Sequence, residues 1–599
     1  MRNRLQSLAR AAALLAAVML IALLLAVAIV HLPMVQRWAG AQVSAHLPAG
    51  VQIERATITL FPPGVQLTKV AVGTDTPMLA SVSCRLRLPA LLGGRLELST
   101  VVVDGATLVV LRDADGQLQF SGPLAVLLAA EAASAASAPS PAAATMLAQL
   151  PAVTVNHASI TFVDHVGHGG PRTLQLTAVR LTVDNAAAGS MPFTLAAQLD
   201  PSGQISGQGI VRQIVAADGG GANHTIDVTL TASRLDADTV LSYLAASLPG
   251  GGTAEAQGSL DASLTLSGSR ASGLSGDATL SQSVGAIVWD EVHLAAPLEM
   301  SAHLVVSPDT LVLSDGHLHI AQVAAARVVA SDFAAEFAYA DSALHLTSAQ
   351  ARAYGGSLTQ HGTVTVRDPP MYDVTVRADD VDCEALLTAV TGERPNYGCE
   401  RLSAEAAVHG QWTGAESVAH GAQGSGRIEM RGGTIPSSSI IGAVWHAAVP
   451  VLAAGREPRN IGAPTRVDRL TESFTLRDGV MHTSDLSLLT DDYTVTGTGR
   501  IGLEGTLDLN TEVALTAAGV AKLLVMAALP IPSSVPALPP IPTIITGTVG
   551  SPTIRPDVED LPFAAVRSLF TGARGAGEVL KEGAGRGLRG IKRGLEEFW

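Results

Sequence analysis

The sequence predicts a mainly β protein: an N-terminal transmembrane helix, then a long, curved antiparallel β-sheet with a few short helices, and a C-terminal amphipathic helix. Three observations predict this fold. An apolar run near the N-terminus is long enough to span a bilayer, most of the chain alternates with a period of two, and the C-terminus carries a basic amphipathic pattern. Only 15% of residues are charged and 4% aromatic, so the apolar residues are mainly aliphatic, which suits sheet faces.

The apolar run is Ala11 to Val30, which as a helix would be about 30 Å long, enough to span a bilayer core. Arg2, Arg4 and Arg10 precede it, and no lysine or arginine follows before Arg37. The positive-inside rule therefore places the N-terminus in the cytoplasm and everything after His31 outside it. The alternative is a cleaved signal peptide with a small-residue site at residues 26–28.

The alternation is clearest between Tyr493 and Leu515. Odd-numbered positions there are apolar or glycine, and even-numbered positions are mostly polar, so one sheet face is apolar and the other faces water. The pattern recurs in several further segments, among them residues 226–232, 260–266, 362–366 and 372–376. The residues expected to line the apolar face are Val495, Ile501, Leu503, Leu507, Leu509, Leu260, Leu264 and Leu266. Those expected to face water are Thr494, Thr496, Arg500, Glu504 and Asp508.

Turns and short helices interrupt this meander. Residues 113–116, Asp315-Gly316 and Asp478-Gly479 are typical of hairpin connections. Helical patterns at Asp236 to Leu248 and Asp382 to Val390 each open on acidic residues, which suit a helix N-terminus. The two helices begin similar blocks about 145 residues apart, which indicates an internal repeat.

These features predict six regions. Residues 1–31 form the cytoplasmic N-terminus and membrane anchor, residues 32–121 an N-terminal β region, and residues 122–150 an Ala/Ser/Pro linker. Residues 151–380 and 381–560 form the central and C-terminal β regions, and residues 561–599 a basic tail. In the tail, Leu588, Ile591, Leu595 and Phe598 recur at helical spacing among basic residues. The alternative is a glycine-loosened segment without a membrane role.

The sequence contains no pattern that indicates catalysis, and we expect neither an enzyme nor a cofactor. Gly497-x-Gly499-x-x-Gly502 resembles a dinucleotide fingerprint but lies within an alternating strand. The three cysteines do not have metal-ligand spacing; either Cys383 and Cys399 form a disulfide and leave Cys84 free, or all three are unpaired. The net charge of −15 and only four lysines argue against nucleic-acid binding.

Several short motifs resemble those of the AsmA family, the inner-membrane-anchored periplasmic group that includes TamB and YhdP. The resemblance covers nearly the whole chain. Its N-terminal part comprises Leu60 to Leu67, Leu86 to Leu88, Leu91 to Gly94, Val103 to Gly105 and Arg112 to Gly116. Val153 to Asp164 resembles a strand, turn and strand ending in Asp. Its most specific part comprises Gly424 to Gly433, Phe474 to Val480, Tyr493 to Leu509 and Ile545 to Asp557.

The resemblance implies a role in outer-membrane biogenesis, with membrane phospholipid carried between the membranes along an apolar β-groove. It also implies that residues 11–30 anchor the protein in the inner membrane. Such a role is compatible with a partner protein in the outer membrane or elsewhere in the envelope. The alternative function is that of a scaffold that affects outer-membrane protein and lipopolysaccharide levels without holding lipid. The alternating pattern by itself is also compatible with a sandwich that buries its apolar face against a second sheet.

Overall fold

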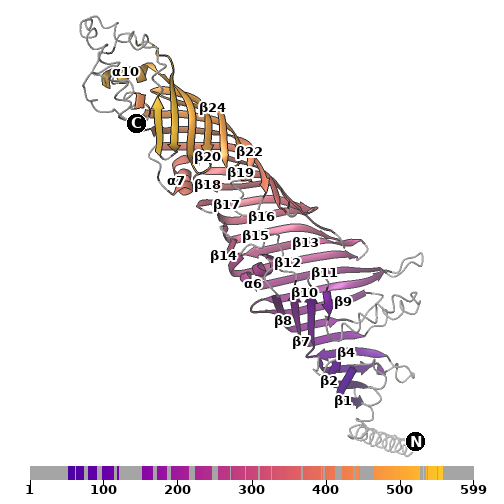
Figure 1. Cartoon of the computed structure of the whole chain (residues 1–599). Helices are drawn as coiled ribbons and strands as arrows, with labels where there is room; N and C mark the ends of the chain where they lie inside the picture. Colours follow the sequence, from indigo (N-terminus) through magenta and orange to yellow (C-terminus); the bar gives the residue numbers. More distant parts are fainter. Residues whose placement is uncertain are drawn as a thin grey trace, which may run out of the picture. The chain divides into compact units, whose positions relative to one another are not determined.

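The computed structural model describes residues 51–556 with gaps (Figure 1). The gaps are residues 61–62, 73–78, 89, 91–96, 114–117, 121–150, 166–171, 185–189, 215–222, 246–253, 270–271, 290–291, 308–309, 326, 366–368, 393, 395–397, 412–420, 436–439, 441–442, 445–464, 527–530, 532–534, 536 and 550. The predicted anchor, linker and basic tail therefore lie outside the described residues. Within the described part of the chain, no helix has the length and apolarity needed to cross a bilayer.

The chain divides into two compact units. The first comprises Met1–Ile287 and Glu299–Ser314, and the second comprises Val288–Leu298 and Asp315–Trp599. The boundary between the units falls within strands β14 (Gly285–Trp289), β15 (Val292–Val306) and β16 (Leu311–Ala325).

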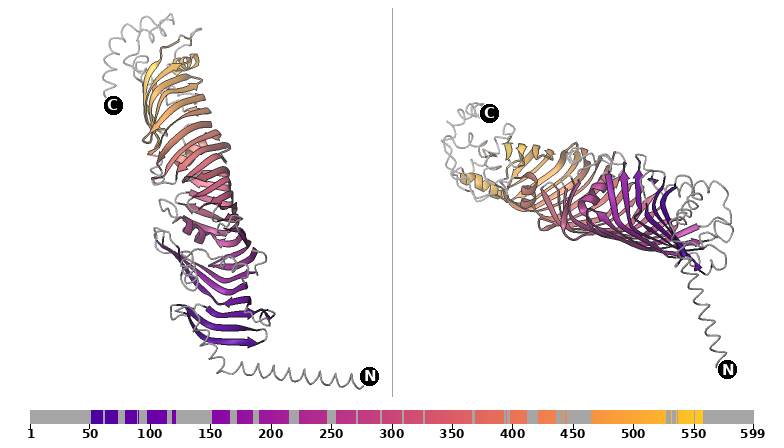
Figure 2. Two further views of the ribbon diagram at one scale, coloured as in Figure 1. Left: turned by 90° about the vertical axis from the view of Figure 1, so that its right-hand side faces the viewer. Right: turned by 90° about the horizontal axis from the view of Figure 1, so that it is seen from below.

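The first unit is a β-sheet whose strands pair mainly with their neighbours in sequence, which confirms the predicted meander. In Figure 2 the order of the strands along the chain can be followed by the colour change from indigo to magenta. Its other elements are β1 (Val51–Leu60), β2 (Pro63–Val72), β3 (Leu79–Leu86), β4 (Leu98–Asp104), β5 (Thr107–Arg112), β6 (Leu118–Phe120), β7 (Ala152–Asp164), β8 (Arg172–Val183), β9 (Ser190–Asp200), β10 (Gln204–Ile214), β11 (Asn223–Asp236), α6 (Ala237–Ala245), β12 (Ala254–Ser269) and β13 (Gly273–Gln282).

Strand β7 departs from the purely antiparallel arrangement that the sequence predicts. Its first half pairs in parallel with β4 and its second half in parallel with β5. The resemblance predicts a turn within this segment, but β7 is one strand with an irregularity around His157, which has a φ of 50°. The His157 Nδ1 lies 2.8 Å from Asp104 Oδ1 on β4. A long strand beside two shorter ones replaces the predicted hairpin.

The second unit is an antiparallel sheet in which successive strands again pair. Its elements are β17 (Val328–Ala340), β18 (Ala343–Ala353), β19 (Gly356–Thr365), β20 (Met371–Asp382), α7 (Cys383–Thr391), β21 (Gly398–Gln411), β22 (Gln423–Ile435), β23 (Thr465–Arg477), β24 (Val480–Thr490), β25 (Tyr493–Gly502), β26 (Thr506–Leu515), α10 (Ala517–Met526), β27 (Ile541–Thr548) and β28 (Ser551–Pro556).

The two Asp-Gly pairs that predicted hairpins have different structures. Asp478-Gly479 joins β23 to β24 in a two-residue turn with φ values of 50° and 74°, as predicted. Asp315-Gly316 is not a turn: β16 continues through it, with Asp315 at a φ of 50°. Aspartate adopts the left-handed conformation more readily than most residues, so the pair distorts a strand here instead of ending it. Residues 114–117 of the third predicted turn are not described.

The two predicted helices, α6 and α7, are confirmed and begin alike. The Asp236 carboxylate accepts a hydrogen bond from Thr239 N at 2.9 Å, and the Asp382 carboxylate accepts one from Ala385 N at 2.9 Å. Each aspartate thereby satisfies a backbone N–H that has no partner within the helix. The acidic residues at the start of each predicted helix therefore act as caps.

A β-bulge precedes each of these caps. The register between paired strands shifts just before Leu235 on β11 and just before Val381 on β20. Arg234 and Asp380, one residue earlier, have φ values of 54° and 53°. The extra residue reverses the alternation, so Leu235 and Val381 are buried. The repeat therefore consists of a bulge, a buried aliphatic residue, an aspartate cap and a helix.

Helix α10 was not predicted, because no acidic residue marks its start. Thr516 caps it instead, accepting a hydrogen bond from Gly519 N at 3.1 Å. Lys522 on α10 donates to the buried Asp492 carboxylate at 2.7 Å, and Thr465 donates to the same carboxylate at 2.7 Å. These contacts attach α10 to the start of β23 and to the turn between β24 and β25.

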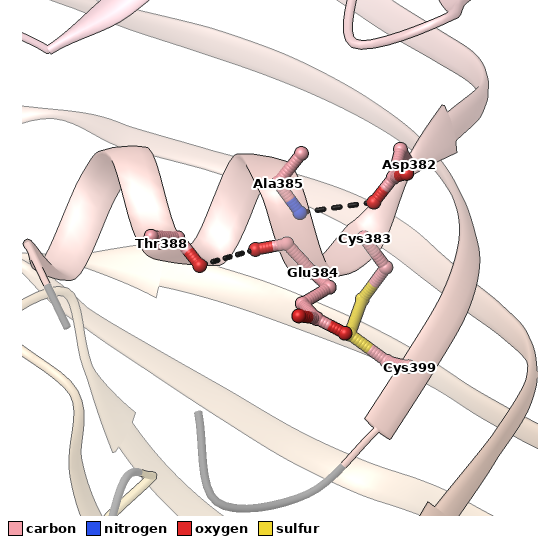
Figure 3. The surroundings of a disulfide bond; sticks show 6 residues. All are labelled: Asp382, Cys383, Glu384, Ala385, Thr388 and Cys399. Carbon is pink, nitrogen blue, oxygen red and sulfur yellow. Dashed lines mark hydrogen bonds between the residues drawn. A yellow bond between two sulfur atoms is a disulfide. The ribbon is translucent and has the colours of Figure 1, made fainter. Parts of the chain in front are cut away.

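A disulfide joins the start of α7 to the start of β21 (Figure 3). It connects Cys383 and Cys399, whose Cα atoms are 5.4 Å apart, as the first alternative from the sequence proposes. Both cysteines are buried, whereas Cys84 is half-buried and free. The bond closes a loop across a sequence separation of 16 residues.

We expect the cysteines to label in two classes. Alkylation of the unfolded, unreduced protein should modify Cys84 alone, whereas reduction beforehand should expose Cys383 and Cys399 as well, as mass spectrometry can measure. A loop of this length predicts that the Cys383→Ala/Cys399→Ala variant loses about 3 kcal/mol of stability. Modification of all three cysteines without reduction would contradict the disulfide, and Cys84→Ala is the control for the stability measurement.

Candidate functional site

Strands β9 to β13 of the first unit present one continuous apolar face. The register between these five neighbouring strands aligns alternate residues of each strand into rows across the sheet. These rows contain only apolar residues and glycine. The rows are Met191–Val211–Ile226–Gly268–Leu274, Phe193–Gly209–Val228–Leu266, Leu195–Gly207–Leu230–Leu264–Ala278 and Ala197–Ile205–Ala232–Ala262–Leu280. Because side chains of paired residues point to the same side, the rows form one surface.

This apolar face is incompletely covered. Of the residues in the four rows, only Ala197 is buried, at 7% exposure, and all others are half-buried. The fully buried residues nearby form two small clusters, one around Val179 and the other around Leu260. A sandwich would bury such leucines against a second sheet, and the described residues place no second sheet over these rows.

The opposite face of the same strands is polar. Ser206 on β10 and Thr231 on β11 share a hydrogen bond of 2.6 Å, and Ser263 on β12 and Thr279 on β13 share one of 2.7 Å. The side chains between these pairs are largely exposed hydroxyls, amides and charged groups. The sheet therefore separates an apolar side from a hydrated side, as the period of two predicts.

Glycines on β10 let side chains from neighbouring strands lie over its backbone. A Cβ at Gly207 would lie 2.6 Å from Leu230 Cδ2, and a Cβ at Gly209 would lie 2.7 Å from Phe193 Cζ. Both distances are too short for carbon atoms, so larger residues would displace these apolar side chains. Because the glycines have no side chain of their own, the apolar side chains of the neighbouring strands pack over β10 and the apolar face is continuous there.

The three candidate residues of the first unit divide between this face and the core. Leu264 and Leu266 are half-buried members of the apolar rows. Leu260 is 3% exposed and packs in a cluster with Leu235 of β11 and with Ala237 and Val240 of α6. The structure therefore gives Leu260 a packing role beneath α6 and leaves Leu264 and Leu266 on the open surface.

The five candidates of the second unit also divide. Val495 is 1% exposed within a core cluster that includes Tyr493 and Val513. Leu509 is buried in a second cluster, and Ile501 and Leu507, which face each other across β25 and β26, pack against it. Thr496, Arg500, Glu504 and Asp508 are exposed, and Thr494 is half-buried.

Leu503 was wrongly assigned to the apolar face. Strand β25 ends at Gly502, and Leu503 lies in the turn to β26, where it is 45% exposed. Gly505, with a φ of 89°, completes the chain reversal. The alternation in the sequence continues through this turn, but a period of two fixes sides only while the backbone is extended.

Sequence reasoning missed an acidic residue on the apolar face of the second unit. Cross-strand pairing places Glu472 of β23 at the end of an otherwise apolar row, Leu358–Ala378–Ala404–Ile428–Glu472. Its neighbours two positions away along β23 are Leu470 and Phe474, which lie on the same face. A glutamate at an apolar position of an alternating strand was the sequence signal that could have identified it.

Glu472 is buried without full hydrogen bonding. Its side chain is 4% exposed, and its Oε1 has no partner. Burial raises the pKa of its carboxyl from an ordinary value of 4.5 to about 7, and the nearby Asp485 carboxylate adds to the increase. On the adjacent strand, Thr483 is also buried, and its Oγ1 has no partner.

The described residues contain no cluster of three or more His, Cys, Asp or Glu side chains able to hold a metal ion. Comparisons with protein-family models, curated proteins and solved structures give no match to this chain. The candidate site therefore rests on the chain's own geometry: an incompletely covered apolar face in the first unit, and an apolar face carrying one buried carboxyl in the second.

We expect Glu472→Gln to stabilise the protein increasingly as the pH rises from about 5 to about 8. The folded-state pKa of Glu472 is about 7 and its ordinary value is 4.5, so between these values the folded state binds more protons. The wild-type free energy of unfolding should therefore fall across this window by on the order of 3 kcal/mol. Little difference between variant and wild type should remain near pH 4.

Urea unfolding at a series of pH values measures this effect. The matched control is Glu512→Gln, which makes the same change on the exposed face of β26. A stability difference between wild type and Glu472→Gln that does not vary with pH would show that Glu472 titrates normally.

Proposed function

We propose that this protein carries phospholipid between the inner and outer membranes along the apolar face of its sheet, and so supports outer-membrane biogenesis. The observation that carries the proposal is the set of four apolar rows on β9 to β13, in which every residue except Ala197 is half-buried. Acyl chains lying on these rows would remove apolar surface from water, at roughly 25 cal/mol per Å².

Two sequence features support the cellular setting of this proposal. The apolar run Ala11 to Val30, with arginines before it, favours an uncleaved anchor in the inner membrane and a periplasmic location for the sheet. The motifs that resemble the AsmA family extend from the N-terminal strands to Ile545 to Asp557. In this proposal the apolar face forms a curved groove, and lipid contacts the half-buried apolar side chains of the rows, among them Leu264 and Leu266.

The proposal requires no covalent chemistry. Lipid is held by the apolar face and shielded from water while the polar face remains hydrated. A face made of apolar side chains and glycine makes no directional contacts with an acyl chain, so the acyl chain can slide along it. Glycine positions such as Gly207 and Gly209 keep that path free of protruding side chains.

Photo-crosslinking along β12 tests the lipid contact. A photoreactive amino acid at position 264 or 266 should form adducts with membrane phospholipid, because these residues belong to the apolar rows. The matched positions 265 and 267, on the exposed face of the same strand, should give several-fold fewer adducts. Equal labelling at all four positions, or lipid-free protein throughout, would favour the scaffold function instead.

The anchor has a separate test. If residues 11–30 remain as a membrane span, the mature protein should retain Met1 and fractionate with the inner membrane. A reporter fused after Trp599 should be active only outside the cytoplasm. A mature N-terminus near Ile29 would instead identify a cleaved signal peptide.

A further inference from the structure

The surroundings of Glu472 define a polar site within an apolar surface. Along β23 its same-face neighbours are Leu470 and Phe474, and across the pairing to β22 it faces Ile428. All three of these side chains are half-buried, so the surface beside the carboxyl is accessible although Glu472 itself is 4% exposed. A hydrocarbon chain lying over these three residues would bring its polar end to the carboxyl.

Thr483 adds a second hydrogen-bonding group. It pairs with Phe474 across β23 and β24 and therefore lies on the same face as Glu472, one strand away. Its Oγ1 is buried without a partner, like the Oε1 of Glu472. Two such atoms are costly in a folded protein, because each loses its hydrogen bonds with water and gains none in return.

The charged groups around Glu472 do not neutralise it. Asp485 on β24 is acidic, and its carboxylate accepts a hydrogen bond from Ser473 N at 2.7 Å. On β22, Arg427 and Glu429 flank Ile428 and therefore lie on the opposite face. Glu429 forms ion pairs there with Arg431 and Arg469. Among the described residues, none that faces Glu472 across these strands is a cation.

We propose that Glu472 and Thr483 bind the primary ammonium group of an amphiphile whose hydrocarbon chain lies on the apolar face of β22 to β24. An ammonium supplies both features that the site lacks, a positive charge for the carboxylate and N–H donors for two unpartnered oxygens. A quaternary ammonium supplies the charge without donors, and an alkyl sulfate would be repelled. This inference rests on the proposed function and specifies the headgroup of the lipid carried.

Native mass spectrometry of the delipidated full chain tests this site. The protein is mixed with equimolar ethanolamine and choline phospholipids that have identical acyl chains, so only the donors on the headgroup nitrogen differ. Wild type should prefer the ethanolamine lipid roughly 10-fold or more, the value of one hydrogen bond to a charged group. Glu472→Gln should bind both lipids equally, and Thr483→Val should show a reduced preference.

Glu512→Gln, on the exposed face, is the matched control and should retain the wild-type preference. Circular dichroism of each variant verifies that the sheet is folded. Retention of the preference by folded Glu472→Gln would overturn the assignment. Equal binding of both lipids by wild type would overturn it while leaving lipid carriage intact, whereas binding of neither lipid would refute the proposed function itself.

Discussion

The structure depends on the in-register pairing of neighbouring strands. Main-chain hydrogen bonds between strands align residues whose side chains point to the same face of the sheet. The alternation of apolar and polar residues along each strand then produces apolar and polar rows across the sheet. In the first unit this alignment places Leu195, Leu230 and Leu264 in one row although they are far apart in sequence. The apolar face is thus a product of register, and it needs no helix or second sheet to form.

The two units use this constraint differently. In the first, the rows on β9 to β13 stay half-buried except at Ala197, and the buried cluster under α6 is small. In the second, Val495 and Val513 are buried in a core that also includes Tyr493, and burial raises the pKa of Tyr493. The same alternating pattern therefore produces open surface in one place and closed core in another, depending on what packs over it.

The sequence predicted those features that depend on local chemistry. The period of two identified the strands, and the acidic residues before α6 and α7 identified the caps, because both signals act within a few residues. Features that depend on distant partners were not predictable. The parallel pairing of β7 with β4 and β5, and the burial of Val495 but not of Leu264, are decided by segments far away in the chain.

Two local errors are equally informative. Leu503 fits the alternating sequence pattern of β25 but lies in a turn. Asp315-Gly316 is a residue pair typical of turns but lies within a strand. Composition alone does not state where the backbone reverses. Glu472, in contrast, was visible in the sequence as a charged residue at an apolar position, and the burial that makes it unusual comes from neighbouring strands.

The bulges before Asp236 and Asp382 affect how the chain can change in length. Within a regular strand, inserting or deleting one residue exchanges the two faces for everything that follows, so a polar side chain would point to the apolar side. A bulge already holds one extra residue and reverses the facing locally, just before Leu235 and Val381. Single-residue changes can therefore be absorbed at such bulges, whereas within a regularly paired stretch the length must change in pairs.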